Sequence, residues 1–556
     1  MGITKMDREK QLNEAALVNY DVAIIGGGIN GAGIALDLAK RGVSTILLEK
    51  KDFGWYATSS STKLIHGGLR YLEYFELALV RESMAERERL LSNAPHLVKP
   101  LKLNVPIYKH SKRPAWMVRA GLTLYDILSY DKSLPNHSYT ANTRKKREQA
   151  VIDPALNQED LTAVLSYYDC QVAFPERLAL ELIIGAEDAG ATTLNYFEVL
   201  SLSQDSEQKY HVLKSVDKLT NTKYEIMAKY VINAGGPFVD NVNINLDQEV
   251  GRKMGGTKGS HLLIKRFEGG PEEAIYVEAR QDGRPYFIIP WLDYYLVGTT
   301  DIFYDGDMNE VHATEEEIKY LLYELNQLIP GYTFKKEDVL YTYSGIRPLP
   351  FEPGKKERSV TRRHIILDHE KEGGSPRVFS IIGGKLTTYR SLAEETADII
   401  CSRLAVSVAC STRSELLPGA RLSEANKDAI HDLATQYQIS EASIQHLQSF
   451  YGSRSKELLE QIRESPELAS HISEDRPEIM AEVAYAIEAE HAETLADIFF
   501  RRTKIGSYAD RSIDVVNSVA ELAAKKLYWS PEETQDEIKI LMSLISEENG
   551  HESGLA

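Results

Sequence analysis

The chain has 556 residues, which is too long for one compact core, so we expect two or three domains. Its apolar content of 43% and charged content of 26% are usual for a globular protein, while a net charge of −18 disfavours nucleic acid as a partner. Cys170, Cys401 and Cys410 show no C-x-x-C spacing, so we expect free thiols in a reducing cytosol and no metal site. No apolar run reaches the roughly 18 residues that span a bilayer, and we expect no signal peptide in the charged segment 1–14.

Near the start of the chain, the apolar residues 21–25 predict a buried parallel strand. Residues 30–41 predict a helix that ends at Gly42, and residues 43–48 predict a second strand that ends at Glu49. Strand, glycine-rich turn, helix, second strand and acidic residue follow in the order of a dinucleotide-binding unit. A plain glycine turn is the less favoured alternative.

The glycines of the turn have separate mechanical roles. Gly26 allows the tight bend, Gly28 lets the backbone approach a pyrophosphate, and Gly31 lets helix and strand pack closely. The pyrophosphate would meet free N–H groups at the helix N-terminus. Glu49 could accept hydrogen bonds from a ribose, which disfavours NADP. These residues alone leave FAD and NAD open.

Further along, hydroxyls, glycines and cations crowd into residues 58–72, where we favour ligand contact over a flexible linker. Residues 230–237 and 378–390 each predict a strand that ends in glycines. Together with the first turn, these would place three strand ends at one edge of an open α/β sheet. Ligands bind at such an edge.

A second, mixed or antiparallel sheet is predicted from segments 259–264, 286–291, 295–301 and 339–349. From about residue 413 helical spacing dominates, which indicates a separate all-α domain.

Several longer motifs resemble those of the FAD-dependent glycerol-3-phosphate dehydrogenases, the respiratory, quinone-linked family. The most specific are His-Gly-Gly-Leu-Arg-Tyr-Leu at 66–72 and Gly-Gly-Lys-Leu-Thr-Thr-Tyr-Arg at 383–390. Lys-Gly-Ser-His at 258–261, Tyr-Ser-Gly-Ile-Arg-Pro-Leu at 343–349 and Phe-Arg-Arg-Thr-Lys at 500–504 also match.

The resemblance implies an α/β FAD-binding Rossmann-like domain, an antiparallel or mixed-sheet substrate-capping domain and a C-terminal all-α domain. We expect the FAD-binding domain at 20–105, 155–245 and 340–412, the capping domain at 106–154 and 246–339, and the helical domain at 413–556.

The implied reaction is oxidation of sn-glycerol 3-phosphate to dihydroxyacetone phosphate. Hydride would pass from C2 to flavin N5, and the electrons would pass to a membrane quinone. His261 would be the general base and Arg347 would stabilise developing negative charge. The expected phosphate ligands are Arg70, Tyr71, Arg362 and Lys385. The expected FAD contacts are Gly26, Gly28, Asn30, Gly31, Glu49, Thr58, Ser59, Ser60, Lys63, Leu64, His66, Gly68, Ala234, Gly235, Gly384, Lys385, Leu386 and Thr387.

Other interpretations remain open on the residues alone. His261 could be a satisfied core histidine, and Arg362 could belong to a solvated surface pair. The alternative activities are a glycerol-3-phosphate oxidase that produces hydrogen peroxide and an amine or amino-acid oxidase of the same fold. A non-enzymatic flavoprotein is a further alternative.

A membrane acceptor would require surface attachment, since no spanning helix is expected. Residues 109–125 contain five cations around an apolar stretch with Trp116, a composition that suits anionic lipid headgroups. A core helix with charged ends is the equally favoured alternative. We therefore expect a cytoplasmic protein, peripheral on the cytoplasmic membrane face, with a homodimer possible.

Overall fold

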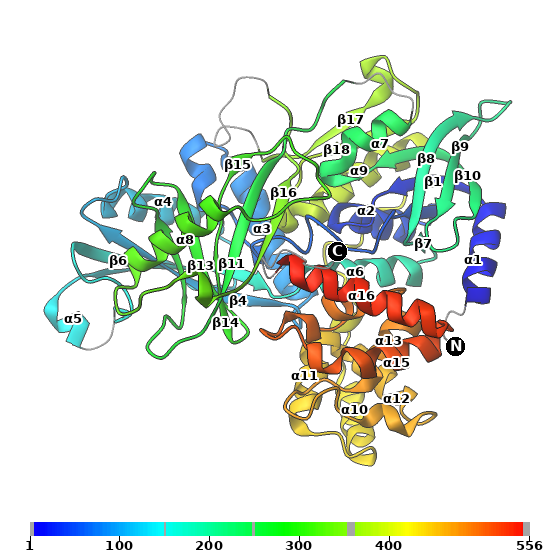
Figure 1. Ribbon diagram of the computed structural model, residues 1–556. Coiled ribbons are helices and arrows are strands. Elements are labelled where there is room, and N and C mark those ends of the chain that lie inside the picture. Colours follow the sequence, from blue (N-terminus) through cyan, green and yellow to red (C-terminus); the bar gives the residue numbers. More distant parts are fainter. Residues whose placement is uncertain (1–4, 149–151, 247–250, 353–361, 549–556) are drawn as a thin grey trace.

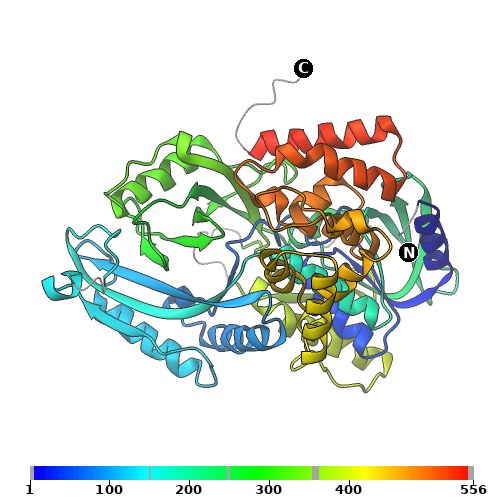
Figure 2. The same cartoon turned by 90° about the horizontal axis from the view of Figure 1, so that it is seen from below.

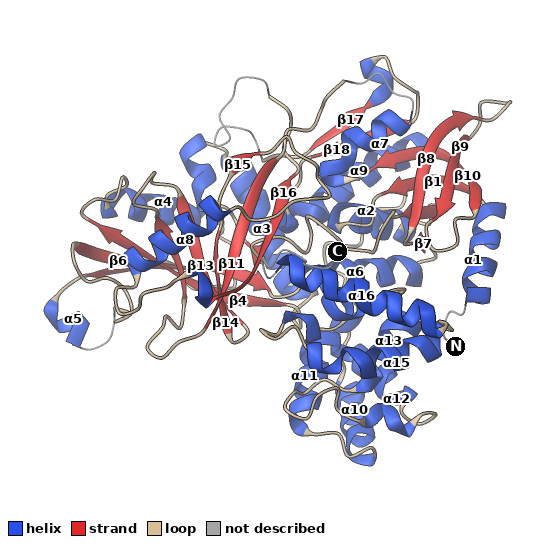
Figure 3. Cartoon of the chain, in the orientation of Figure 1, coloured by secondary structure: helices blue, strands red, loops and turns tan. Residues whose placement is uncertain are grey.

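The computed structural model describes residues 5–148, 152–246, 251–352 and 362–548 (Figure 1). Their strands form two separate sheets, which Figure 3 shows in red, and a helical region lies against both. Within these ranges, no helix is both long and apolar enough to cross a lipid bilayer.

The first sheet has the central order β17-β18-β10-β1-β2-β7, and β9 and β8 extend it from β10. β1 pairs in parallel with β10 and β2, and β10 pairs in parallel with β18. The β1 side chains Val22, Ala23 and Ile24 are fully buried, as expected for a parallel strand covered on both faces. The strands are β1 Asn19–Ile25, β2 Thr45–Leu48, β7 Thr192–Leu194, β8 Phe197–Gln204, β9 His211–Asp217, β10 Lys223–Asn233, β17 Ile365–Asp368 and β18 Val378–Ile382.

Helix α2 (Ile29–Lys40) lies on this sheet between α6 (Pro175–Asp188) and α9 (Tyr389–Leu404). Its predicted end is confirmed, because Gly42 follows it with a φ of +76°, a conformation that favours glycine. α1 (Lys5–Leu17) and α7 (Val239–Asn245) contact β10 at the same sheet.

The parallel strands β1, β10 and β18 end at one edge of the first sheet, as predicted. Gly26, Gly235 and Gly383 follow these ends closely, so three glycine-containing loops meet there. This edge faces the second sheet, from which the remaining walls of the site come (Figure 1).

The second sheet has the order β15-β11-β14-β13-β12-β4-β6-β3, with β16 on β11 and β5 on β6. Its pairs are antiparallel apart from β12 with β4. Helix α8 (Glu315–Leu328) buries Ile318, Leu321 and Leu325 in one core with this sheet, and a capping box at Thr314 starts it. The strands are β3 Leu64–Ile65, β4 Val98–Tyr108, β5 Ser138–Ala141, β6 Leu161–Val172, β11 Thr257–Lys265, β12 Ala274–Glu278, β13 Pro285–Trp291, β14 Tyr294–Gly298, β15 Ile302–Phe303 and β16 Val339–Arg347.

The strands β4, β6 and β16 differ from the domain ranges expected from the sequence. Those ranges assign β6 and most of β4 and β16 to the FAD-binding domain, whereas all three pair within the second sheet. An apolar alternating segment predicts a strand but carries no local signal for its partner, because pairing is a long-range property. The chain therefore crosses between the two sheets at positions that differ from those expected.

The predicted helical region packs below the two sheets in Figure 1, and Figure 2 shows the same molecule from below. Its core contains Val483, Leu495, Phe499 and Val519, which lie in the segments where helical spacing was predicted. The three-part fold prediction is confirmed. The helices are α10 Glu424–Gln436, α11 Glu441–Tyr451, α12 Ser455–Gln461, α13 Met480–Ala489, α14 Leu495–Asp497, α15 Val516–Leu527 and α16 Pro531–Glu548.

Candidate active site

A cavity of about 840 Å³ lies between the glycine edge of the first sheet and the second sheet. The first sheet contributes Gly26, Glu49 and Ala234, and the second contributes His261 and Arg347. The two predicted groups of site residues therefore meet in one space, although they lie hundreds of residues apart in the sequence.

One end of the cavity has the geometry of a dinucleotide cradle. Gly26 has a φ of +113°, and a Cβ there would lie 2.6 Å from the Ala234 carbonyl oxygen, so only glycine fits. Gly28 is the N-cap of α2 and offers no side chain to the helix N–H groups. The Glu49 carboxylate accepts from the N–H groups of Gly27 at 2.7 Å and Lys51 at 2.9 Å, and it faces the cavity. This suits a ribose beside a pyrophosphate.

An unpaired acceptor supports occupation of this cradle by a ligand. The Asn30 Oδ1 atom is buried and has no hydrogen-bond partner within the described chain, while its Nδ2 lies 3.4 Å from the Gly383 carbonyl oxygen. A Cβ on Gly384 would lie 2.7 Å from the same Nδ2, so glycine is needed beside Asn30. Buried polar atoms are normally hydrogen-bonded, and a flavin dinucleotide carries both phosphates and hydroxyl or N–H donors. The residues therefore fit FAD.

Most of the expected FAD contacts line the cavity. They are Gly26, Gly28, Asn30, Glu49, Thr58, Ser60, Leu64, His66, Gly68, Ala234, Gly235, Gly384, Lys385, Leu386 and Thr387. His66 lies there with its backbone N–H on Thr387 Oγ1 at 3.0 Å, and burial lowers its pKa.

Three of the expected FAD contacts lie outside the cavity wall. Gly31 packs against the Gly26 carbonyl oxygen, so it has the helix–strand packing role of the turn. The Ser59 hydroxyl donates to the Tyr56 carbonyl oxygen at 3.1 Å, and the Lys63 ammonium lies 5.0 Å from the centre of the Trp291 ring. These two side chains therefore make contacts away from the cavity, while Thr58, Ser60 and Leu64 of the same loop line it.

His261 projects from β11 and is 2% exposed. Its ring stacks on Tyr343 with centres 4.8 Å apart, and its Nε2 lies 3.0 Å from the Thr62 hydroxyl. Its Nδ1 is buried without a partner within the described chain. Burial, reinforced by Arg347 and Lys63, lowers the pKa of His261 to about 3, so the imidazole is neutral at physiological pH.

Arg347 ends β16 and is held from several sides. Its Nη2 donates to the Thr299 hydroxyl at 2.9 Å, and its Nη1 donates to Asp301 Oδ1 at 3.1 Å. Burial raises the pKa of Asp301, but Arg347 and Arg362 outweigh this and lower it. A side chain at position 259 would collide with the Arg347 guanidinium, so Gly259 makes room for it. Arg347 is thereby fixed against the cavity beside His261.

The other predicted cations line the same end of the cavity. The Lys385 ammonium lies 3.9 Å from the centre of the Tyr71 ring and donates to the Ser83 hydroxyl at 3.2 Å. Arg362 lies 3.7 Å from Asp301 Oδ2, and its Nη1 is buried without a hydrogen-bond partner in the described residues. The surface-pair alternative for Arg362 is therefore wrong. We define the basic cluster as Arg70, Arg347, Arg362 and Lys385, which with Tyr71 line the cavity.

Sequence reasoning missed several side chains that shape this end. Thr299 and Asp301 orient Arg347, Thr62 contacts His261, and Arg284 is a further cation in the wall. The Gly-Thr-Thr-Asp run at 298–301, the end of the predicted strand 295–301, was the available signal, since polar residues at a strand end often face a site. Arg284 carries no comparable local signal.

Comparisons with known proteins agree with this geometry. Residues 21–390 match the family described as FAD dependent oxidoreductase, and residues 410–534 match the C-terminal domain of alpha-glycerophosphate oxidase. The chain is 43% identical over 533 residues to glycerol-3-phosphate dehydrogenase of Synechocystis sp., covering 94% of this chain and 95% of that protein. It is 36% identical over 488 residues to D-erythritol 1-phosphate dehydrogenase of Brucella abortus, covering 87% and 94%.

Among solved structures, the glycerol-3-phosphate dehydrogenase from Bacillus halodurans complexed with FAD matches with a TM-score of 0.78 and 29% identity. The match covers 98% of this chain and 97% of that chain, so it includes both sheets and the helical region. The chain therefore belongs to the family of FAD-dependent glycerol-3-phosphate dehydrogenases, and its cofactor is FAD.

Proposed function

We propose that the protein oxidises sn-glycerol 3-phosphate to dihydroxyacetone phosphate. The observation that carries this proposal is that one cavity joins the dinucleotide cradle to the basic cluster. Arg70, Arg362 and Lys385 supply cations for a phosphate, and the neighbouring His261 and Arg347 suit alcohol oxidation. Two of the similar relatives, from Synechocystis sp. and Brucella abortus, are named for polyol phosphates, which agrees with a phosphate subsite.

In this proposal each residue has a defined task. FAD, when bound, supplies the acceptor for the hydride of C2. The neutral His261 accepts the proton of the C2 hydroxyl, and Nδ1 is the ring nitrogen with no partner in the described chain. Arg347 stabilises negative charge that develops on that oxygen, since its guanidinium is already oriented by Thr299 and Asp301.

The visible spectrum of the purified yellow holoenzyme tests this activity. Anaerobic addition of sn-glycerol 3-phosphate is expected to bleach the flavin, whereas glycerol, which lacks the phosphate, leaves it oxidised. D-Erythritol 1-phosphate is the discriminating third substrate. A flavin that stays oxidised with glycerol 3-phosphate, or a higher kcat/KM with the erythritol phosphate, would contradict the proposed substrate.

Lys385 gives this substrate recognition a pH dependence. Burial lowers its pKa to about 7, so the free enzyme loses this positive charge as the pH rises above that value. Above pH ~7–8 we expect kcat/KM to decrease with a slope that approaches tenfold per pH unit. The substrate phosphate does not contribute to this slope, because its second pKa is ~6 and it is already ionised.

Lys385→Arg is the matched variant, because an arginine stays charged throughout this range. Its kcat/KM should be lower at pH 7 but flat from pH ~7 to ~9. Equal slopes for the parent and Lys385→Arg in this range would show that Lys385 does not hold the phosphate.

We also propose a quinone at the membrane surface as electron acceptor. Trp116, Met117, Ile127 and Tyr130 are exposed on or just after α4 (Ala115–Leu128), and we call them the α4 apolar face. The opposite side of α4 buries Leu122 and Tyr125, so the helix is only half covered.

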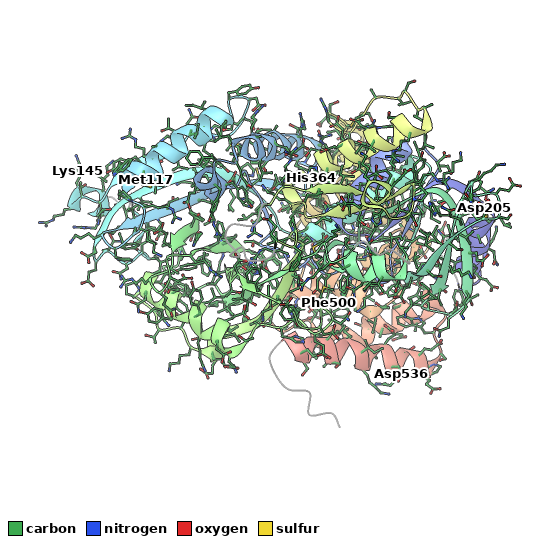
Figure 4. The ribbon with its side chains drawn as sticks, turned by 90° about the horizontal axis from the view of Figure 1, so that it is seen from above. Met117, Lys145, Asp205, His364, Phe500 and Asp536 are labelled. Carbon is green, nitrogen blue, oxygen red and sulfur yellow. The ribbon has the colours of Figure 1, made fainter. Side chains whose placement is uncertain are left out.

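The position of this face supports the proposal. α4 contacts the segment Leu69–Tyr74, which carries Arg70 and Tyr71, and the adjacent Phe75 is 86% exposed. Figure 4 shows Met117 of α4 and Lys145 of the basic helix α5 (Arg144–Glu148) at the same end of the molecule. Exposed apolar residues flanked by cations suit a bilayer with anionic headgroups.

Co-sedimentation with anionic liposomes tests the attachment. Trp116→Glu is expected to reduce the bound fraction about tenfold, since it places a charge where an aromatic ring would enter the interface. Ile540→Glu is the matched control, because Ile540 is 52% exposed on α16, whose Asp536 lies at the opposite end in Figure 4. Binding that is equal for parent and Trp116→Glu would exclude the α4 apolar face as the anchor.

The acceptor itself is tested by product analysis. With glycerol 3-phosphate, the dehydrogenase is expected to reduce a soluble quinone analogue in air without forming stoichiometric hydrogen peroxide. Stoichiometric peroxide without quinone reduction would favour the oxidase alternative.

A further inference from the structure

Arg284 lies in the wall of the active-site cavity without a role in the reaction described above. It directly precedes β13 and ends a tight turn, in which its N–H donates to Asp282 Oδ1 at 2.9 Å. The N–H of Ala279 donates to the Arg284 carbonyl oxygen at 2.8 Å. The backbone of Arg284 is thus fixed, and its side chain shares the cavity wall with Arg347 and Asp301.

The guanidinium of Arg284 is enclosed but incompletely paired. Its side chain is 13% exposed, and its Nε is buried with no hydrogen-bond partner within the described chain. The Asp282 Oδ2 atom lies 3.5 Å from that Nε, at ion-pair distance but without a hydrogen bond. The other oxygen of Asp282 already accepts from the Tyr320 hydroxyl at 3.0 Å. Buried arginine donors normally have acceptors, so a ligand oxygen is expected here.

The charges around Arg284 also favour an anion. Asp301 is shared by Arg347 at 3.1 Å and Arg362 at 3.7 Å. Arg284 is near enough to lower the pKa of Arg347, which burial already lowers, and to lower the pKa of Asp301. Two carboxylates, Asp282 and Asp301, therefore face three guanidinium groups, and a phosphate would compensate the remaining positive charge.

Resting on the proposed function, we infer that Arg284 is a further substrate-binding residue that donates to the phosphate of the substrate. A phosphate offers several acceptor lone pairs, and the planar guanidinium can bind two of its oxygens at once. The phosphate subsite would then extend from Lys385 and Tyr71 to the start of β13, and both sheets would contribute to it.

The test uses the holoenzyme of the Arg284→Gln variant. This substitution removes the positive charge and the bidentate donor geometry of the guanidinium but keeps a polar side chain. We expect the KM for glycerol 3-phosphate and the inhibition constant of inorganic phosphate to rise about 10- to 100-fold, as for loss of a charged hydrogen bond. The kcat should change by no more than about threefold. Arg284→Lys keeps the positive charge but cannot bind two phosphate oxygens in the bidentate way, so it should recover part of the lost affinity.

Arg280→Gln is the matched control, because Arg280 is an exposed cation of the same turn, outside the cavity wall. It should leave both constants unchanged. The inference is overturned if Arg284→Gln binds both ligands like the parent. It is also overturned if only the KM rises while inorganic phosphate binds normally, since Arg284 would then contact the hydroxyls instead.

A failure of the inference about Arg284 can be distinguished from a failure of the proposed function. If the parent flavin is not bleached by glycerol 3-phosphate, the proposed function fails, yet inorganic phosphate can still be titrated by its effect on the flavin spectrum. Equal phosphate affinity of the parent and Arg284→Gln in that titration would then overturn the inference by itself. Melting temperatures of both holoenzymes establish that the variant is folded.

Discussion

Arg347→Met is expected to lower the rate of flavin reduction by glycerol 3-phosphate about 10²- to 10³-fold, the usual effect of removing one oriented donor from a developing oxyanion. The guanidinium is fixed before substrate binds, because Thr299, the Thr300 carbonyl oxygen and Asp301 all accept from it. The methionine fills a similar volume but donates no hydrogen bond. Stopped-flow absorbance of the anaerobic holoenzyme measures the effect directly.

Loss of Arg347 also removes one of the cations that compensate the negative charge of Asp301 in the cavity wall. The stability of the folded variant therefore needs a separate control. In the double variant Arg347→Met with Asp301→Asn, the unpaired charge is gone, and stability should recover while the reduction rate stays low. Arg347→Lys should retain the positive charge but lose the bidentate donor geometry, so its rate of flavin reduction should be intermediate. A single variant with parental rates and normal FAD content would refute a role for Arg347 in catalysis.

The orientation of Arg347 depends on a buried network behind the cavity. The Glu317 carboxylate at the start of α8 accepts from the Thr300 hydroxyl at 2.5 Å and the Ser260 hydroxyl at 2.8 Å. Lys258, 3% exposed, forms an ion pair with the same carboxylate at 2.8 Å. These contacts join the strand of His261 to the residues that orient Arg347. Preorganisation of this kind lets the site stabilise charge without rearrangement during the reaction.

The sequence predicted those features that are encoded locally. The turn at Gly26 follows from one short segment, since the glycine is required by a φ of +113° and by the nearby Ala234 carbonyl oxygen. The motif around His261 and Arg347 could be assigned through resemblance. The features that were missed are long-range. The partners of β4 and β6, the position of Arg284 in the wall and the support of Asp301 depend on how distant segments meet, which no local pattern specifies.

The loop after β2, which carries Glu49 and Asp52 and which we call the cofactor loop, is linked to the helical region by contacts that are long-range in the same way. Arg501 and Arg502 lie in a π-helical turn, Ile498–Arg502, and reach across to Asp52, which follows Glu49 by three residues. Arg502 donates to both Asp52 oxygens, at 2.6 Å and 2.8 Å, and Asp52 is 1% exposed. This explains the Phe-Arg-Arg-Thr-Lys motif structurally, because its arginines fix the loop after β2.

Arg502→Met is expected to lower the free energy of unfolding of the holoenzyme by about 3–5 kcal/mol, since it leaves a buried carboxylate incompletely paired. The variant should also release FAD at lower urea concentrations, because the loop that carries Glu49 loses its support. Urea titration followed by tryptophan and flavin fluorescence measures both. Arg413→Met is the matched control, since Arg413 is 59% exposed and its partner Glu394 keeps an ion pair with Arg390, so the loss should be at most about 1 kcal/mol.

The pH dependence of stability provides a second, independent measurement. Burial raises the pKa of Asp52, but Arg502 and Arg501 outweigh it and hold the pKa at about 2, below the unfolded value of ~3.9. The stabilisation is therefore complete above pH ~4 and is lost as the pH falls from ~4 toward ~2. In Arg502→Met this acid-sensitive component should shrink, and Asp52→Asn added to Arg502→Met should restore part of the lost stability. An Arg502→Met holoenzyme as stable as Arg413→Met would show that the buried pair does not hold the helical region to the cofactor loop.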